Sequence, residues 1–213
     1  DDVSMKNRLQ VQYDYMESHK DICLLGSSAY KIDKEGKKIG EICPATDCAS
    51  IKTMLLFNNS IIHPSVMIRR NTLWEEVTSY NELHLASEDY GMWCSLAASE
   101  KKIKILPDKL INYRYNDDSI TVTTKKEKML DAYIDIYSLF IRKLGIDVKR
   151  EEILCYCNFV RDYDCDKNLE NFLQLEKKVR QVLLLRSDYN IKLFDNIIFG
   201  VIRGYAVENH INI

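Results

Sequence analysis

The stretch Ala86-Ser87-Glu88-Asp89-Tyr90-Gly91-Met92-Trp93 places two adjacent carboxylates at the head of an apolar run, about two-fifths of the way along the chain. Acidic side chains are favoured in the first turn of a helix, where backbone N–H groups lack partners and the macrodipole is positive. The stretch therefore predicts a helix that begins at Glu88. A carboxylate such as Asp89, projecting from the start of a rigid helix, can also act as a general base. An ordinary helix start explains the same residues, so the other motifs must decide between the two interpretations.

The composition is typical of a globular domain. The chain has 213 residues, of which 46% are hydrophobic and 29% charged, and its formal net charge is −2. This length allows one large domain or one domain with an appendage. The near-neutral charge argues against a nucleic-acid partner. No apolar run approaches the ~18 residues that a transmembrane helix needs, and we expect no signal peptide at the start.

The cysteine pattern indicates free thiols rather than a disulfide framework or a zinc site. The seven cysteines are odd in number and irregularly spaced, and they contain no CxxC pair. We therefore expect reduced, mostly buried thiols in a cytoplasmic protein. The cysteines are Cys23, Cys43, Cys48, Cys94, Cys155, Cys157 and Cys165.

Before residue 124 the sequence alternates between strand-like and helix-like segments. Ser4 is expected to cap the first helix, and Gly36 marks a turn within a hairpin. Pro107 is expected to end a strand because proline cannot donate a ladder hydrogen bond. The predicted elements are a helix from Ser4 to about Ser18, strands at Ile22–Ile32 and Lys38–Ile42, a helix at Ser50–Phe57, a strand after Pro64, a helix at Asn71–Val77, the helix at Glu88, and strands at Lys102–Leu106 and Leu110–Asn116.

From about Thr124 onward the pattern is helical. Proline is absent, and apolar residues recur at the spacing of a helix face. Gly145 is placed to end the first of these helices. We therefore divide the chain into an α/β part, residues 1–123, and an all-helical appendage, residues 124–213. The predicted helices are Lys125–Leu144, Lys149–Asp162, Leu169–Arg186 and Ile191–Val207.

Residues outside the central helix are further candidates for chemistry. Asp1 and Asp2 precede a helix, where paired carboxylates suit a hard divalent cation and its phosphate ligand, although solvated acids near a chain end are common. His63 stands before a proline at the entrance of a strand, where a histidine is more often structural than catalytic. Arg114 in the last predicted strand is a candidate phosphate ligand or an ordinary surface residue.

Four motifs in order are much more specific than any one of them alone. They are Asp1-Asp2-Val3-Ser4-Met5-Lys6-Asn7-Arg8-Leu9-Gln10, His63-Pro64-Ser65-Val66-Met67-Ile68-Arg69-Arg70, Glu88-Asp89-Tyr90-Gly91-Met92-Trp93, and Tyr113-Arg114-Tyr115-Asn116 with Ser119. With these motifs, residues 1 to about 120 closely resemble the second half of a family 2 glycosyltransferase domain of the GT-A type. The resemblance implies an α/β fold, the C-terminal part of a Rossmann-like domain with a mixed sheet.

The resemblance also implies a metal site and a general base. Asp1 looks like the last acid of the DxD motif, which holds Mn²⁺ or Mg²⁺ against the diphosphate of the donor, and Asp2 looks like the acid that follows it. Asp89 resembles the general base that deprotonates the acceptor hydroxyl. Glu88 matches the usual neighbour of that base.

Three more residues match positions that the family uses for donor or acceptor binding. His63 matches a His-Pro motif near the cleft, and Arg114 matches a Tyr-Arg motif in a loop that can close over the diphosphate. Trp93 ends the motif that carries the base. Asn116 departs from the family, which often has a histidine there, and this weakens any metal or phosphate role at that position.

The implied function is transfer of a sugar from a nucleotide-diphosphate sugar to a glycan or lipid-linked acceptor, in bacterial surface polysaccharide biosynthesis. Such a transfer needs an activated hydroxyl, which a carboxylate base supplies. It also needs a neutralised leaving group, which a divalent ion supplies. One base and no covalent nucleophile fit an inverting single displacement.

The first half of the family's domain, which binds most of the nucleotide, is absent from this sequence, as is the first Asp of DxD. An alternative therefore stays open, namely a non-catalytic, degenerate half-domain that acts as a binding or assembly module. A metal-dependent nucleotidyltransferase is disfavoured because the chain lacks a basic, glycine-rich phosphate loop. The appendage is a candidate surface for a homodimer or for peripheral association with the inner face of the membrane, but its balanced charge argues against strong electrostatic membrane binding.

Overall fold

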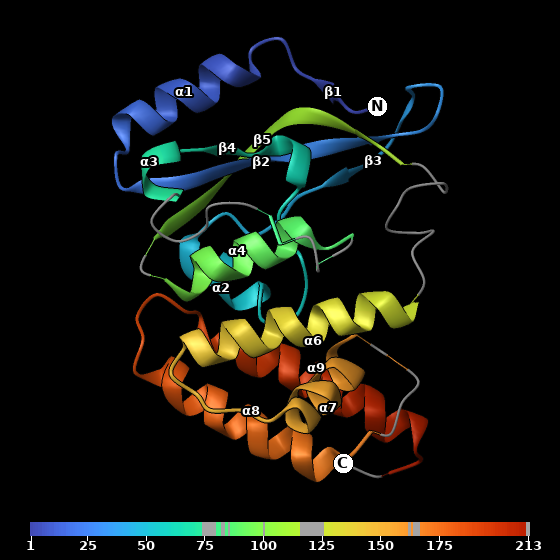
Figure 1. The fold of residues 1–213 in the computed structure, drawn as a ribbon. Coiled ribbons are helices and arrows are strands. Elements are labelled where there is room, and N and C mark those ends of the chain that lie inside the picture. Colours follow the sequence, from blue (N-terminus) through green and yellow to red (C-terminus); the bar gives the residue numbers. More distant parts are fainter. Residues whose placement is uncertain are drawn as a thin grey trace.

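The computed structural model describes residues 1–73, 80–81, 84, 86–99, 101–115, 126–161, 163 and 167–211. A mixed sheet lies between helix α1 (Arg8–Ser18) on one face and helices α2 (Cys48–Met54) and α4 (Glu88–Ala98) on the other (Figure 1). Below α2 and α4 lies a layer of further helices. The α/β class with a mixed sheet and a following group of helices is confirmed.

The sheet is organised around two long parallel strands. These strands are β2 (Ile22–Ile32) and β5 (Lys102–Arg114). The short strands pair antiparallel at their sides, in the order β1-β5-β2-β3 with β4 also on β2. The first eight residues of β2 are buried, as expected for a strand that is covered on both faces. The short strands are β1 (Val3–Ser4), β3 (Lys38–Ile42) and β4 (Met67–Ile68).

The expectation that Pro107 ends a strand is wrong. Strand β5 continues through it to Arg114, where the two predicted strands form one. The pairing of β5 with β2 shifts from Ser27 opposite Leu106 to Ser28 opposite Lys109. Pro107 therefore lies in a bulge, where its missing N–H removes no ladder hydrogen bond.

The expected start of the first helix at Ser4 is also wrong. Ser4 pairs with Ile111 in the sheet, and the N–H of Met5 donates to the carbonyl of Leu110 at 2.9 Å. Helix α1 starts only at Arg8. Pairing with the sheet edge outweighs the local capping signal, because it engages backbone groups that a helix cap would use.

Two other helices differ from their predicted bounds. Helix α2 begins two residues earlier than expected, since the side chain of Asp47 accepts a hydrogen bond from the N–H of Ser50 at 2.8 Å. Helix α3 spans Arg70–Leu73. The remainder of the helix predicted at Asn71–Val77 lies outside the described residues.

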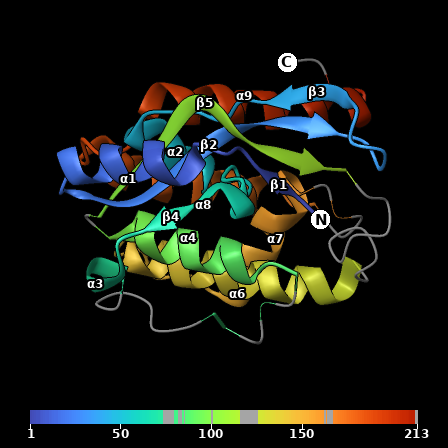
Figure 2. The same ribbon diagram turned by 90° about the horizontal axis from the view of Figure 1, so that it is seen from above.

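The helix at Glu88 and the four later helices are confirmed. Gly145 has a φ of 85° directly after the first of the four, as a helix stop requires. The first of the four, α6 (Lys126–Lys143), lies alongside α4 when the molecule is seen from above (Figure 2). The four helices are α6 (Lys126–Lys143), α7 (Arg150–Val160), α8 (Leu169–Leu184) and α9 (Ile191–Glu208).

One hydrophobic core runs from the sheet into the helices. It includes Trp93 of α4, Tyr137 of α6 and Phe172 of α8, which are all fully buried. Tyrosine hydroxyls of the helices also donate to backbone carbonyls of the α/β region, such as Tyr156 to Leu56 at 2.9 Å. The division into residues 1–123 and 124–213 stays a prediction, and the packing across it is continuous.

The described part of the chain can be searched for disulfides, membrane-spanning helices and clusters of metal-binding side chains. Its cysteines form no disulfide, and four of the six are buried, while Cys165 lies outside it. No described helix is long and apolar enough to cross a membrane. The described histidines, cysteines and acids contain no group of three that is arranged to hold a metal ion.

Candidate active site

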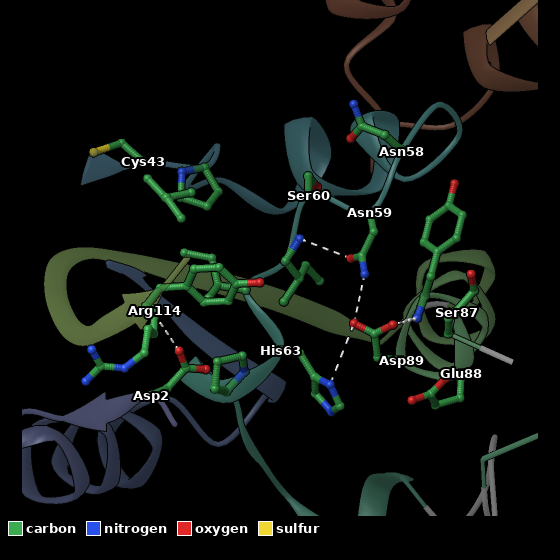
Figure 3. Close-up of a pocket in the computed structure, with 18 of the residues that line it drawn as sticks. Asp2, Cys43, Asn58, Asn59, Ser60, His63, Ser87, Glu88, Asp89 and Arg114 are labelled. Atoms are coloured by element: carbon green, nitrogen blue, oxygen red, sulfur yellow. Dashed lines mark hydrogen bonds and ion pairs between the residues drawn. The ribbon is translucent and has the colours of Figure 1, made fainter. Parts of the chain in front are cut away.

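A pocket of about 1040 Å³ opens between the sheet and the helices, and six of the seven predicted site residues line it. Asp2 and Arg114 lie on one side, Glu88 and Asp89 on the other, and His63 lies between them (Figure 3). The remaining lining residue among the six is Asp1. The fold thus brings together residues that are up to 113 positions apart in the chain.

Asp89 is held in a defined orientation at the start of α4. Its Oδ2 accepts a hydrogen bond from Nδ2 of Asn59 at 2.8 Å, and its Oδ1 accepts one from the N–H of Tyr90 at 2.7 Å. Its side chain is 14% exposed. A carboxylate that is fixed at a helix N-terminus and partly open to a pocket is suited to accept a proton from a ligand hydroxyl.

His63 begins a single turn of 3₁₀ helix, His63–Ser65. Its Nδ1 lies 3.8 Å from Oδ2 of Asp89, and its Nε2 lies 3.0 Å from the hydroxyl of Tyr80. The edge of its ring meets Trp93, with centroids 6.0 Å apart. Trp93 itself is fully buried and does not line the pocket, but its ring contact with His63 connects it to the site.

Arg114, at the end of β5, ties three segments together. Its backbone N–H donates to Oδ1 of Asp2 at 2.6 Å, and its Nε donates to the carbonyl of Asp1 at 3.0 Å. Its Nη1 donates at 2.7 Å to the carbonyls of Asp33 and Lys34, in the turn between β2 and β3. In this structure the guanidinium fixes the start of the chain against the sheet.

The acidic side of the pocket fits a metal that takes few protein ligands. Asp1 and Asp2 are adjacent, and one oxygen of Asp2 already accepts the N–H of Arg114. Mg²⁺ is commonly bound through one or two carboxylates and completes its shell with water and substrate phosphates. The donor set therefore fits such an ion as part of a site that the substrate completes.

Burial and the acids that line the pocket raise the pKa of two nearby tyrosines, Tyr80 and Tyr113. Burial raises the pKa of Tyr80, and the charges of Asp89 and Glu88 raise it further. Burial likewise raises the pKa of Tyr113, with added contributions from Asp2 and Asp89. The acidic side chains attract a cation and disfavour a bare diphosphate beside them, which is consistent with binding of the two together.

Sequence reasoning missed four residues that shape this pocket. Asn59 orients Asp89, and Tyr113 lines the wall beside Arg114. Tyr133 and Arg161 reach the pocket from the helices that the sequence assigns to a separate appendage. The polar run at residues 58–60, after an apolar helix, is a signal that could have indicated Asn59.

No protein-family model matches the sequence. The chain is 33% identical, over 135 residues, to an uncharacterized glycosyltransferase of Methanocaldococcus jannaschii, covering 62% of this chain and 46% of that protein. It is 28% identical to the amylovoran biosynthesis glycosyltransferase AmsE of Erwinia amylovora, covering 56% of this chain and 44% of that protein. It is also 28% identical to the O-antigen biosynthesis glycosyltransferase WbnJ of Escherichia coli, covering 67% and 53%.

These comparisons confirm the resemblance at the level of glycosyltransferases. The family 2 and GT-A assignments stay predictions. The chain spans about half the length of the curated relatives that it matches.

Proposed function

We propose that this chain forms the acceptor-side part of a glycosyltransferase of surface polysaccharide biosynthesis. It transfers a sugar from a nucleotide-diphosphate sugar to a glycan or lipid-linked acceptor, with inversion. The observation that carries the proposal is Asp89, an oriented carboxylate that faces a pocket with Asp2 on its opposite side and with Asp1 also in its lining. Similarity to three glycosyltransferases supports the reaction class.

In this mechanism Asp89 removes the proton from the acceptor hydroxyl as its oxygen attacks the anomeric carbon of the donor. The bond from that carbon to the diphosphate breaks on the opposite face, which inverts the configuration. Asn59 holds the carboxylate in place through its 2.8 Å hydrogen bond. A divalent ion held by Asp1 and Asp2 would neutralise the charge on the leaving diphosphate.

His63 and Arg114 are the proposed donor or acceptor ligands, and Trp93 is a positioning residue. His63 lies beside both Asp89 and Tyr80, so its ring adjoins the carboxylate that the acceptor hydroxyl must reach. Trp93 packs against that ring from the core. Arg114 keeps the acidic pair near the pocket through its bonds to Asp1 and Asp2.

The test is metal-dependent sugar transfer by the full-length protein, with the two adjacent carboxylates compared. Asp89→Asn keeps the size of the side chain and removes its charge, and we expect turnover to fall by about 10²- to 10⁴-fold with donor affinity unchanged. Glu88→Gln neutralises the second candidate catalytic acid in the same helical turn, and we expect a smaller loss of turnover than in Asp89→Asn. Asp131→Asn, on the exposed part of α6, is the control for loss of a carboxylate. Wild-type turnover in Asp89→Asn excludes it as the base.

The alternative of a non-catalytic binding or assembly module is favoured by one observation. The guanidinium of Arg114, the predicted phosphate ligand, donates to three backbone carbonyls. Stable dimerisation through the helices, without any affinity of the full-length protein for a nucleotide sugar, would support this alternative. Metal-dependent nucleotide-sugar binding by the full-length protein would exclude it.

A further inference from the structure

Arg161, directly after α7, forms part of the pocket wall together with Tyr133. Its Nε donates to the hydroxyl of Tyr137 at 3.1 Å. Its guanidinium carbon lies 4.0 Å from the ring centre of Tyr133 and 5.0 Å from that of Tyr90. Tyrosine rings therefore hold the charge in place and leave it positive, since they provide no counter-charge.

This guanidinium has no acidic partner among the described residues. Its Nη2 is buried there and has no hydrogen-bond acceptor. Lys52, a fully buried cation at the boundary with the helices, is paired with Asp188 at 2.8 Å. A buried charged donor without an acceptor is costly, so an unpaired one in a pocket wall indicates a missing anion.

Two further polar atoms of the pocket lining also lack partners within the described structure. They are the buried hydroxyl oxygens of Ser60 and Ser87. Ser87 directly precedes the two acids of α4, and its side chain makes no capping hydrogen bond to that helix. Both hydroxyls can donate hydrogen bonds to a ligand in this pocket, as the guanidinium of Arg161 can.

We propose that the Arg161 side of the pocket binds an anionic group, a carboxylate or a phosphate, that belongs to the sugar acceptor. This inference rests on the proposed function. Tyr90, which the guanidinium covers, follows Asp89 in α4, so a group held there lies on the same side of the pocket as the base. Asp2, a proposed ligand of the metal ion, and Arg114 lie on the opposite side (Figure 3).

A purely structural role for Arg161 makes a different prediction. An arginine at the end of a helix is stabilised by the helix dipole, and its stacking on tyrosines adds packing energy. Neither effect distinguishes a charged ligand from a neutral one. Selectivity for charge is therefore the property to measure.

The experiment compares the affinity of the full-length protein for three soluble probes by calorimetry. Glucose 1-phosphate carries a phosphate, glucuronate carries a carboxylate, and methyl glucoside is neutral. We expect Arg161→Gln to weaken binding of at least one anion by about tenfold or more and to leave methyl glucoside unchanged. Which anion is lost distinguishes a phosphate-bearing acceptor from an acidic sugar. Equal weakening for all three probes, or no weakening, would overturn the inference.

Two controls separate this site from its surroundings. Arg150→Gln removes an exposed arginine from the start of the same helix, and it should leave all three affinities unchanged. Pyrophosphate with Mn²⁺ reports on the donor diphosphate, and its affinity should not change in Arg161→Gln. Loss of pyrophosphate binding in that variant would assign Arg161 to the donor instead and overturn the inference.

A second measurement covers the case in which Arg161→Gln does not fold. In wild-type protein with ¹⁵N-labelled arginine, the Nε–H signal of Arg161 should shift on addition of the anion and not on addition of methyl glucoside. Tyr137→Phe, which removes the acceptor of that N–H, assigns the signal. If the Nε–H signal of Arg161 shifts with neither anion, the proposed site is refuted.

The two proposals fail in different ways. A protein that transfers sugar but binds neither anion better than methyl glucoside refutes the acceptor site alone. A protein that binds an anion through Arg161 but transfers no sugar refutes the proposed function. Asp89→Asn should lower transfer by about 10²- to 10⁴-fold and keep anion binding.

Discussion

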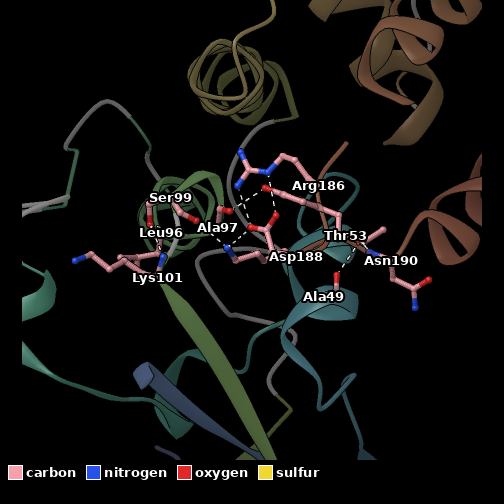
Figure 4. A network of polar contacts seen from close by, with 11 residues as sticks. Ala49, Thr53, Leu96, Ala97, Ser99, Lys101, Arg186, Asp188 and Asn190 are labelled. Atoms are coloured by element: carbon pink, nitrogen blue, oxygen red, sulfur yellow. Dashed lines mark hydrogen bonds and ion pairs between the residues drawn. The ribbon is translucent and has the colours of Figure 1, made fainter. Parts of the chain in front are cut away.

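Two cations, Lys52 and Arg161, lie where the helices meet the α/β region, and they differ in whether an acidic side chain pairs with them. At the first place, Lys52 is 1% exposed, and its Nζ donates to Asp188 at 2.8 Å and to the carbonyl of Ser99 at 2.7 Å. Arg186 also binds Asp188 (Figure 4). At the second, Arg161 faces the pocket with no acid beside it in the described structure. At the first place the buried cation has an acidic partner, and at the second it has none in the described structure.

The difference indicates which charges hold the fold and which await a ligand. Buried charges that satisfy one another contribute to the geometry of the joint, and removal of either leaves the other uncompensated. A buried charge left without its counterpart is retained only at some cost to stability, which function can explain. The comparison therefore predicts that loss of a charge from the Lys52–Asp188 pair lowers the stability of the fold. Loss of the charge of Arg161 should instead lower the affinity for a ligand.

The largest expected effect on stability is at the complete joint. Asp188→Asn leaves the ammonium of Lys52 buried beside two neutral acceptors, and we expect a loss of about 3 to 5 kcal/mol in the free energy of unfolding. Lys52→Met should cost less, about 1 to 3 kcal/mol, because Asp188 keeps Arg186 as a partner and its side chain is 32% exposed. Urea denaturation of the two variants measures both values. A larger loss for Lys52→Met would contradict this view of the joint.

Addition of a methyl group to a helical glycine should change stability in opposite directions at two sites, one tightly packed beside α6 and one open. A Cβ at Gly91 would lie 2.3 Å from Nδ1 of His84, whose Nε2 is fixed 2.7 Å from Asp135. Gly91→Ala should therefore destabilise the protein by about 1 to 3 kcal/mol. Gly200 lies in α9 with no atom within 4 Å of its Cβ position, so Gly200→Ala should stabilise by about 0.5 to 1 kcal/mol. Thermal unfolding of both variants tests the pair.

The same joint predicts a moderate sensitivity to acid. Burial raises the pKa of Asp188, but hydrogen bonds and charges from Arg186 and Lys52 outweigh it and lower the pKa to about 2. Because the folded-state pKa is depressed, the stabilisation is present above about pH 4 and is lost as the pH falls towards 2. A depression of this size corresponds to about 2 kcal/mol, the same order as the loss expected in Asp188→Asn, which neutralises the same carboxylate. Urea midpoints between pH 5 and pH 2 should shift less in Asp188→Asn than in the wild type.

Much of the fold could be predicted from local patterns. Apolar periodicity gave the later helices and the long strand β2, and the acids at the start of α4 located that helix. The errors at Ser4 and Pro107 share one cause. Each residue pairs or bulges against a strand that is distant in the chain, and local sequence carries no information on that partner.

The site was predicted unevenly for the same reason. Asp89 and His63 belong to short motifs, and the structure places both in one pocket. Asn59 and Arg161 belong to no motif, and only the folded chain brings them beside Asp89 and Tyr90. A division of the sequence into two parts also hid the contribution of the helices to the pocket, since Arg161 lies beyond residue 124.

The two arginines at the ends of α7 give the smallest expected effect and the sharpest contrast. Arg150 is paired with Asp131 at 2.7 Å, but their side chains are 65% and 73% exposed, so the pair should contribute only about 0 to 1 kcal/mol and less in high salt. Arg150→Gln should therefore change neither the urea midpoint nor anion affinity measurably. Arg161, which has no ion-pair partner in the described structure, should dominate anion affinity. If Arg150→Gln weakened anion binding as much as Arg161→Gln, the selectivity would reflect the general charge of the helices, and the contrast between the paired and unpaired cations would lose its meaning.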